Sequence, residues 1–401
     1  MPRRTKIIIA VVVVLLLTAL GVFLYFFLKK ESALPPIGGT FPPPTDEIPS
    51  AEEGPPTTLP EEIPGPFEPI LRQLSKAPVA GFMLGARSGE PIVRYQERAA
   101  GNIYEIEADG EGEKRLTNTT IPKVYEALWS KTGSSLISRY LREGSEIIES
   151  FSARVVPSTS GTEGELQGTF LPRGILSAAL SPDGKKVVYV QEENGGSSSI
   201  TSDINGERRE KIWESPVKEW LVSWPAAQRI ALLSKSSGLA SGLLISVDPR
   251  NGVKTLLLRA IPGLTALINP VKPLVLYSAS GQTGITFSLL DETSGRRSPI
   301  RLTTLPEKCV WTKDGERFYC GVPRVIPQGT YPDVWYQGVI SFEDEVWSSA
   351  PDTGADERIQ DISDKRGLPI DLINPEISAD EKFLVFMDKK SGTVWSLQMK
   401  E

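Results

Sequence analysis

Residues 179–190 read Ala-Leu-Ser-Pro-Asp-Gly-Lys-Lys-Val-Val-Tyr-Val, an apolar segment followed by a polar turn and a β-branched strand. An Asp beside a Gly suits the backbone of a tight turn, and Val and Tyr favour a half-buried strand. The same pattern returns at residues 129–137 and 311–319, where a Trp precedes the turn. The segment therefore predicts a β-hairpin that the chain repeats.

The repeat has the period of a propeller blade. Its anchors, weaker copies included, stand at positions 86, 130, 181, 224, 269, 312 and 378. Five of the six spacings lie between 43 and 51 residues, and four-stranded blades run about 40 to 45 residues. No sustained helical apolar stripe follows Lys30. We expect an all-β fold, a seven-bladed β-propeller, with six blades as the alternative if the weak copy at Ala86 is spurious.

The two ends of the repeat region complement each other. Only a short stretch follows the last anchor at Ser378, so the final blade lacks an outermost strand. Residues 69–75, ahead of the first blade, resemble outer strands such as residues 299–303. We expect this N-terminal strand to complete the seventh blade, because closure removes two exposed strand edges. The propeller would then span residues 67–401.

A membrane anchor is predicted at the N-terminus. Residues 7–28 carry no charge, and a helix of that length spans about 33 Å, close to the hydrocarbon thickness of a bilayer. Arg3, Arg4 and Lys6 favour a cytoplasmic N-terminus. A cleaved signal peptide is the alternative, but no small-residue cleavage pattern follows the run. We expect residues 1–30 to form a cytoplasmic tip and a retained single-pass transmembrane helix.

A linker is expected between the anchor and the propeller. Residues 31–69 hold 12 prolines and eight acidic side chains but no Lys or Arg. Proline favours extended geometry and like charges repel, so residues 31–69 should reach up to about 120 Å, and residues 31–66 should form a disordered, stiff linker. It would hold the propeller in an extracytoplasmic position.

Residues 70–401 carry a net charge of only −3 without the basic stripe of nucleic-acid binding, so we expect no nucleic-acid partner.

The repeat resembles a known family. Residues 181–190, 312–319 and 378–386 are similar to the repeat of TolB-type β-propellers, a WD-like repeat. The resemblance covers residues 67–401 and implies a binding platform in the bacterial cell envelope. The chain departs from TolB because a predicted membrane helix and linker stand in place of its α/β domain. It also lacks the hydrolase domain of prolyl-oligopeptidase-like propellers, so peptidase activity does not follow.

Composition restricts the chemistry. The chain has no His and only two Cys, which excludes His-based nucleophilic sites and both imidazole and four-cysteine metal sites. No catalytic motif stands out, so we expect a non-catalytic binding or scaffold module of the envelope, with no cofactor and no metal. The alternative is a carboxylate-based envelope glycosidase or lyase, which needs two acids about 5 to 10 Å apart at the mouth of the central channel. Residues 343–345, Glu-Asp-Glu, favour a solvated turn over such a pair.

Blade six carries an insert. Its anchor spacing of 66 residues exceeds a regular blade by roughly 20 residues, and the excess, residues 323–338, is rich in aromatic side chains. Exposed rings on a rigid scaffold bind sugars or peptides by stacking. Tyr331, Trp335 and Tyr336 are therefore the candidate ligand-binding residues, with an envelope protein, peptide or glycan as partner. The alternative is that these rings pack back onto the blade.

The two cysteines flank the hairpin of blade six. A two-residue turn at Asp314 and Gly315 would place Cys309 directly opposite Cys320. A disulfide would then join a hydrogen-bonded pair with about 5.5 Å between the Cα atoms. An extracytoplasmic location permits the bond, and two buried free thiols are the alternative.

Overall fold

The computed structural model describes residues 67–158, 163–281, 284–363 and 367–400. The predicted membrane helix at residues 7–28 and the linker at residues 31–66 lie outside these ranges, so both stay predictions. Within the described ranges, no helix has the length and apolar character that crossing a membrane requires.

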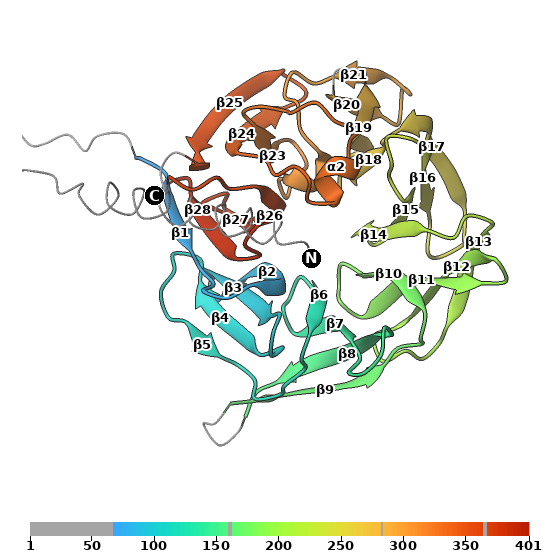
Figure 1. The fold of residues 1–401 in the computed structure, drawn as a ribbon, viewed down its shortest axis with the longest axis vertical. Helices are drawn as coiled ribbons and strands as arrows, with labels where there is room; N and C mark the ends of the chain where they lie inside the picture. Colours follow the sequence, from blue (N-terminus) through green and yellow to red (C-terminus); the bar gives the residue numbers. More distant parts are fainter. Residues whose placement is uncertain (1–66, 159–162, 282–283, 364–366, 401) are drawn as a thin grey trace, which may run out of the picture. The chain divides into compact units, whose positions relative to one another are not determined.

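Seven four-stranded antiparallel sheets stand around a central axis as the blades of a propeller (Figure 1). This confirms the predicted all-β class and favours seven blades over six, because the weak copy at Ala86 belongs to the first hairpin of a complete blade. Blades one and two contain β2 (Val79–Arg87), β3 (Glu90–Glu97), β4 (Ile103–Glu107), β5 (Lys114–Arg115), β6 (Val124–Trp129), β7 (Ser135–Leu141), β8 (Ile148–Val156) and β9 (Glu165–Phe170). Blades three and four contain β10 (Ile175–Leu180), β11 (Lys186–Glu193), β12 (Gly196–Asp203), β13 (Glu210–Ser215), β14 (Trp220–Ala226), β15 (Arg229–Ser234), β16 (Ser241–Val247) and β17 (Lys254–Pro262). Blades five, six and seven contain β18 (Thr265–Ile268), β19 (Leu274–Gly281), β20 (Gly284–Asp291), β21 (Arg297–Pro299), β22 (Cys309–Trp311), β23 (Phe318–Pro323), β24 (Asp344–Ala350), β25 (Ala355–Asp361), β26 (Leu372–Ile377), β27 (Phe383–Asp388) and β28 (Val394–Gln398).

The chain closes its own ring. β1 (Ile70–Gln73) pairs with β28, so the last sheet has the order β1-β28-β27-β26. Leu71 lies opposite Leu397 in this register, and the Arg72 guanidinium donates a hydrogen bond to the Gln398 side-chain oxygen at 3.0 Å. The N-terminal strand thus supplies the outermost strand of the seventh blade, as the sequence predicts.

Hydrogen bonds within the repeated turn explain its sequence. The Ser181 hydroxyl donates to Asp183 Oδ1 at 2.6 Å and accepts from the Lys186 amide at 2.9 Å. Gly184 follows with a φ of 68°, a left-handed conformation that a residue without Cβ adopts at little cost. The turn that begins at Thr312 is built in the same way. The repeat therefore encodes the turn between the two innermost strands of a blade.

The core lies between neighbouring blades. On β11, Val188 and Val190 pack toward blade four, whereas Val187 and Tyr189 pack toward blade two. Successive residues of a strand point to opposite faces of its sheet, and here both faces are covered. This is why the strand after each turn reads as a continuous apolar run.

The antiparallel order gives the ring two unlike faces. One face carries the connections between the second and third strands of each blade and the connections between blades. It includes η1 (Pro306–Lys308) and α2 (Asp333–Tyr336), and we call it the insert face. The remaining turns lie on the opposite face. β1 enters from that opposite face, because Ile70 pairs with Gln398 at the end of β28.

Candidate binding site on the insert face

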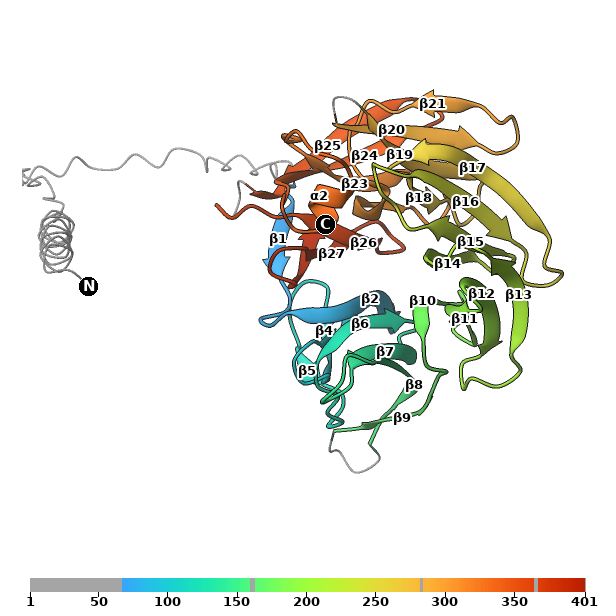
Figure 2. The same ribbon diagram turned by 45° about the vertical axis from the view of Figure 1, so that its right-hand side comes forward.

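The insert comprises residues 324–343, between β23 and β24. Its base is closed where the Arg324 amide donates to the Glu343 carbonyl at 2.9 Å, and Figures 1 and 2 both show α2 beside β23. The insert also reaches blade four, because the Gly238 amide donates to Asp333 Oδ2 at 2.6 Å. A Cβ at Gly263 would come within 2.5 Å of a carbonyl oxygen of the insert, so the backbones pack closely there. The insert therefore covers parts of blades four to six.

The structure buries two of the three aromatic residues proposed as a stacking platform. Tyr331 is 1% exposed and Trp335 is 2% exposed. They join Phe342, Ile285 and Leu305 in an apolar cluster beneath the insert. Neither ring is accessible to a ligand, so the expectation that these two residues bind one is corrected. They pack back onto the blades, because large rings gain most from leaving water.

Tyr336 is the third predicted residue, and it remains 40% exposed. Its hydroxyl donates a hydrogen bond to the Glu307 carboxylate. Burial raises the pKa of Glu307. Burial and the nearby Glu307 carboxylate both raise the pKa of Tyr336. The phenol therefore keeps its proton and holds the end of α2 to η1, while part of the residue stays exposed.

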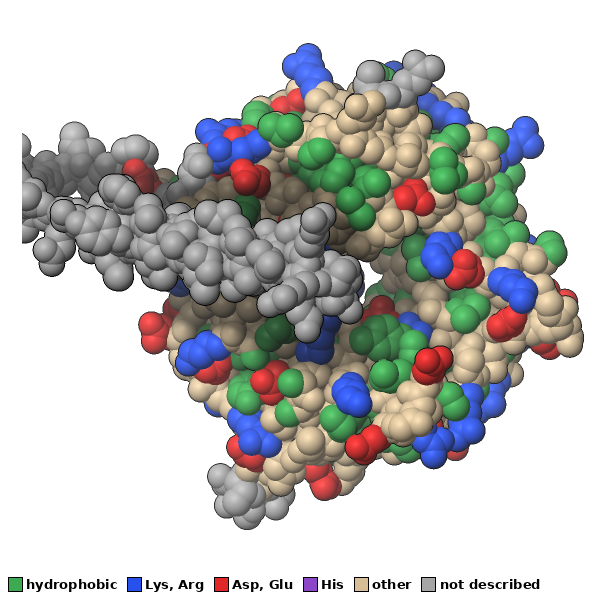
Figure 3. All heavy atoms as spheres, in the orientation of Figure 1, with side chains coloured by type: hydrophobic (Ala, Val, Ile, Leu, Met, Phe, Trp, Pro, Cys, Tyr) green, Lys and Arg blue, Asp and Glu red, His purple; other side chains and the backbone are tan. Residues whose placement is uncertain are grey.

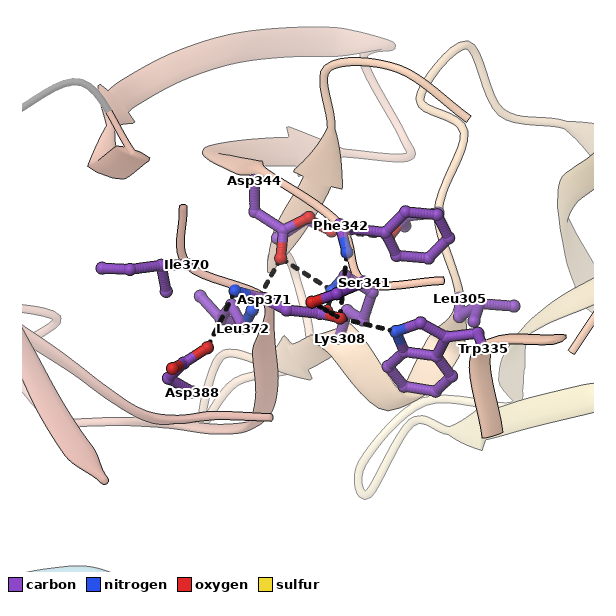
Figure 4. A network of polar contacts seen from close by, with 12 residues as sticks. Leu305, Lys308, Trp335, Ser341, Phe342, Asp344, Ile370, Asp371, Leu372 and Asp388 are labelled. Atoms are coloured by element: carbon purple, nitrogen blue, oxygen red, sulfur yellow. Dashed lines mark hydrogen bonds and ion pairs between the residues drawn. The ribbon is translucent and has the colours of Figure 1, made fainter. Parts of the chain in front are cut away.

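A fully buried lysine joins the insert to the connections before blades six and seven (Figure 4). Lys308 Nζ lies 2.7 Å from Asp344 Oδ2 and 2.5 Å from Asp371 Oδ1, and none of the three side chains is exposed. The ammonium also lies 5.4 Å from the centre of the Trp335 ring and 5.2 Å from that of Phe342, within range of cation–π attraction. Carboxylates and ring faces together compensate the charge, as burial of an ammonium demands.

Asp371 connects this charge to the insert. Its Oδ2 accepts hydrogen bonds from Trp335 Nε1 at 2.9 Å, from the Phe342 amide at 3.0 Å and from the Ser341 hydroxyl at 3.1 Å. Hydrogen bonds to an ionised acceptor are shorter and stronger than those between neutral groups. A single carboxylate therefore fixes both the aromatic underside and the backbone of the insert.

Asp344 shows that residues 343–345 are not the solvated turn that the sequence favours. Its Oδ2 accepts the Leu372 amide at 2.7 Å in addition to the Lys308 contact, and its buried Oδ1 has no hydrogen-bond partner within the described part of the chain. Burial raises the pKa of Asp344 to about 6, an effect that Lys308 partly offsets. Asp344 and Asp371 form a carboxyl pair, but both are buried and bridged by a lysine instead of facing the central channel.

The outer surface of the insert exposes several large apolar side chains. Val325 and Val339 are 72% and 71% exposed, and Leu239, in the loop between β15 and β16, is 87% exposed. That loop contacts Asp333 at the start of α2. We call Leu239, Val325, Tyr336 and Val339 the apolar rim. Figure 3 shows hydrophobic side chains gathered over this part of the ring.

Other apolar side chains are exposed on the same face. Tyr125, Leu176 and Leu221 occupy the second position of the innermost strands β6, β10 and β14. By contrast, the described turns of the opposite face expose two large apolar side chains, Val253 and Val271. Exposed apolar patches are typical of contact with a partner. The insert face, which carries the rim, is therefore the candidate binding surface.

Cys309 and Cys320 are joined by a disulfide with an S–S distance of 2.01 Å. They are directly opposed in β22 and β23, in the register that the sequence predicts. Their Cα atoms are only 4.1 Å apart, so the predicted separation of a hydrogen-bonded pair is wrong. The Thr312 amide donates to the Arg317 carbonyl at 2.9 Å, which makes the turn longer than two residues and shifts the cysteines to a non-hydrogen-bonded position.

The structure also bears on metal binding. Among the described residues, no group of three or more His, Cys, Asp or Glu side chains is placed to hold a metal ion.

Comparisons with known proteins identify the fold. No protein-family model matches the chain, and no curated protein matches it. Solved structures do match. An oligogalacturonate lyase in complex with manganese aligns with a TM-score of 0.50 at 10% identity, over 83% of this chain and 98% of that one. The propeller domain of Cps50 (Swd1) from Myceliophteria thermophila aligns with a TM-score of 0.50 at 12% identity, over 83% and 100%. TolB from Acinetobacter baumannii has a TM-score of 0.43 at 12% identity, over 79% and 66%.

The two matches with a TM-score of 0.50 support the propeller assignment, and the first of them corrects the expectation that the chain is not an enzyme. That expectation relied on the absence of histidine and of a catalytic motif. A lyase is nevertheless among the solved structures that share the propeller fold. The expectation was therefore wrong, because a propeller of this kind can belong to an enzyme. At 10% identity the likeness concerns the fold, and it transfers no lyase residue to this chain.

Proposed function

We propose that the protein is a membrane-tethered propeller that binds an envelope protein through its insert face, outside the cytoplasm. The observation that carries the proposal is the exposed apolar rim, three of whose four residues lie on an insert whose underside is fixed by buried charges. A surface that is already ordered loses less conformational entropy on binding than a mobile loop does. The rim therefore has both the chemistry and the rigidity of a docking surface.

The rim favours a protein partner over a glycan. Stacking on a sugar needs exposed aromatic faces, and the rings of Tyr331 and Trp335 are buried. Aside from Tyr336, the rim side chains are aliphatic, and such groups gain most when they leave water against another apolar surface. The proposed partner therefore presents apolar side chains of its own.

The tether is proposed from the sequence of residues 7–28 and 31–66. The first described strand, β1, begins on the face opposite the insert face. The disulfide between Cys309 and Cys320 supports a location outside the cytoplasm, where such bonds persist.

Site-specific photocrosslinking in intact cells tests the proposal with the full chain in its own membrane. A photoreactive amino acid replaces Leu239 or Val339 on the rim. In matched controls it replaces Val253 or Val271, which are equally apolar and exposed on the opposite face. We expect adducts with a second protein at positions 239 and 339 and none at positions 253 and 271. Adducts at all four positions, at none of them, or only with another copy of this chain would overturn the proposal.

A further inference from the structure

A cleft of about 720 Å³ lies between blades two and three, on the face opposite the insert face. This volume falls within the about 300 to 1,000 Å³ of typical ligand pockets. Strands β8 and β9 form one wall, and the two turns of blade three at residues 181–186 and 203–208 form the other. The cleft is therefore separate from the apolar rim, and nothing in the proposed function uses it.

Small residues create the space. Ser152 and Ala153 on β8 and Gly168 on β9 line the wall of blade two. A Cβ at Gly168 would lie 2.0 Å from the Ser152 carbonyl oxygen, so the close approach of these strands admits no side chain. The Ser152 hydroxyl donates a hydrogen bond to the Ile204 carbonyl across the two blades. A hydrogen bond thus links the two blades at the cleft, and among the described residues no apolar side chains fill the space between them there.

The charges in the cleft are unbalanced. Both carboxylates are engaged: Asp183 accepts bonds from Ser181 Oγ at 2.6 Å and from the Lys185 amide at 3.1 Å, and Asp203 pairs with Arg208 at 2.5 Å.

Beyond the pair of Asp203 and Arg208, the lining holds three cations, Arg154, Lys185 and Lys186, against the single carboxylate of Asp183. Their side chains are exposed and make no hydrogen bond or ion pair within the described ranges of the chain. Like charges repel when they share a concave surface, so a bound anion would relieve an unfavourable interaction as well as form new contacts.

We infer that this cleft binds a small, multiply charged anionic ligand that carries carboxylate or phosphate groups. Arginine matches the planar fork of either group with two hydrogen bonds, and lysines add point charges beside it. The uncharged lining residues Gln167, Thr169 and Asn205 add donors and acceptors suited to hydroxyl groups on the same ligand. The cleft thus supplies charge and polar contacts but no aromatic platform.

Isothermal titration of the full chain in detergent micelles tests the inference. The probes are trigalacturonate, which carries carboxylates, inorganic tripolyphosphate, and neutral maltotriose. We expect saturable binding of at least one anion and none of maltotriose. The double variant Arg154→Gln, Lys186→Gln should weaken that binding at least tenfold. The control double variant Lys254→Gln, Lys313→Gln removes the same charge from exposed positions outside the cleft and should change binding less than twofold.

The outcomes distinguish a carboxylate ligand from a phosphate ligand, and they distinguish binding in the cleft from a general effect of net charge. Preference for trigalacturonate supports a carboxylate ligand, and preference for tripolyphosphate supports a phosphate ligand. Loss of binding by the same factor in both double variants would overturn the cleft assignment, because it would reflect net charge alone. Failure of both anions to bind, or equal binding of maltotriose, would overturn it as well. Crosslinking at positions 239 and 339 is unaffected in every case, so this test and that of the insert face fail independently.

Discussion

Lys308 Nζ and Asp371 Oδ1 lie 2.5 Å apart, and neither side chain is exposed to solvent. The two residues come from the connections that precede blades six and seven. Asp371 also accepts the indole hydrogen bond of Trp335, whose helix carries part of the apolar rim. The outer surface of the insert is therefore positioned by a charge pair beneath it, and substitutions in that pair should change the rim without altering any of its residues.

Replacing the buried lysine tests this dependence. Lys308→Met keeps the length of the side chain but removes the cation that bridges the buried carboxylates of Asp344 and Asp371. Breaking a buried ion pair from one side costs about 3 to 5 kcal/mol, so the free energy of unfolding should fall by that amount. Denaturant unfolding of the full chain in micelles, followed by tryptophan fluorescence, measures it.

The matched control for this prediction is Lys313→Met, which removes an exposed lysine from a turn of the same blade. Its effect should stay within about 0.5 kcal/mol. A Lys308→Met variant as stable as the control would show that the buried charges do not hold the insert in place.

The raised pKa of Asp344 predicts a pH dependence of stability. Burial moves this pKa from 3.8 to about 6 in the folded chain, so folding favours the protonated carboxyl. The stabilisation is complete below pH 3.8 and is lost as the pH rises through 6. Asp344→Asn cannot ionise and keeps an oxygen that accepts the Leu372 amide. Relative to the parent, the variant should therefore gain roughly 1 to 3 kcal/mol between about pH 4 and pH 7.

Comparison of the two proteins at each pH isolates Asp344 together with Lys308 and Asp371, the charged groups that interact with it, because titrating groups elsewhere contribute equally to both proteins. The measurement is the difference in free energy of unfolding at half-unit steps of pH. A difference that stays constant from pH 4 to pH 7 would show that Asp344 ionises equally easily in the folded and the unfolded chain.

The disulfide predicts a loss of stability on removal. Cys309 and Cys320 are 11 positions apart, and closing a loop of that size in the unfolded chain is worth about 3 kcal/mol. The double variant Cys309→Ser, Cys320→Ser should lose roughly that amount. Dithiothreitol should destabilise the parent similarly and leave the variant unchanged. Two thiols that react with a thiol reagent in the unfolded, unreduced parent would contradict the bond.

The blades were predictable from sequence because their turns are made locally. Ser181, Asp183 and Gly184 close their turn with one another and with the following strand, so the pattern can be recognised without knowledge of the rest of the fold. The insert was found by the same means, as an excess in the spacing of these turns. Closure by residues 69–75 followed from counting strands.

The site itself depends on contacts that no local pattern encodes. Lys308 and Asp371 are 63 positions apart, and each alone looks like an ordinary surface charge. The burial of Tyr331 and Trp335 arises because blades four and five approach the insert, as the bond from Gly238 to Asp333 shows. Sequence reasoning therefore located the insert and the exposed Tyr336, but it also selected two buried rings and missed the exposed aliphatic residues.

Glu376 offers a last test, at the junction of blades seven and one. Its Oε2 accepts the Leu84 amide at 2.7 Å, and burial raises its pKa from 4.5 to about 7 despite that bond. The protonated form is thus favoured on folding, and its stabilisation, complete below pH 4.5, is lost as the pH rises through 7. Glu376→Gln keeps the acceptor and cannot ionise, so relative to the parent it should gain roughly 1 to 3 kcal/mol between about pH 5 and pH 8. The measurement is the unfolding free energy of both proteins at the two pH values. If the difference between variant and parent is the same at both, the carboxyl ionises freely at the blade junction and the prediction is wrong.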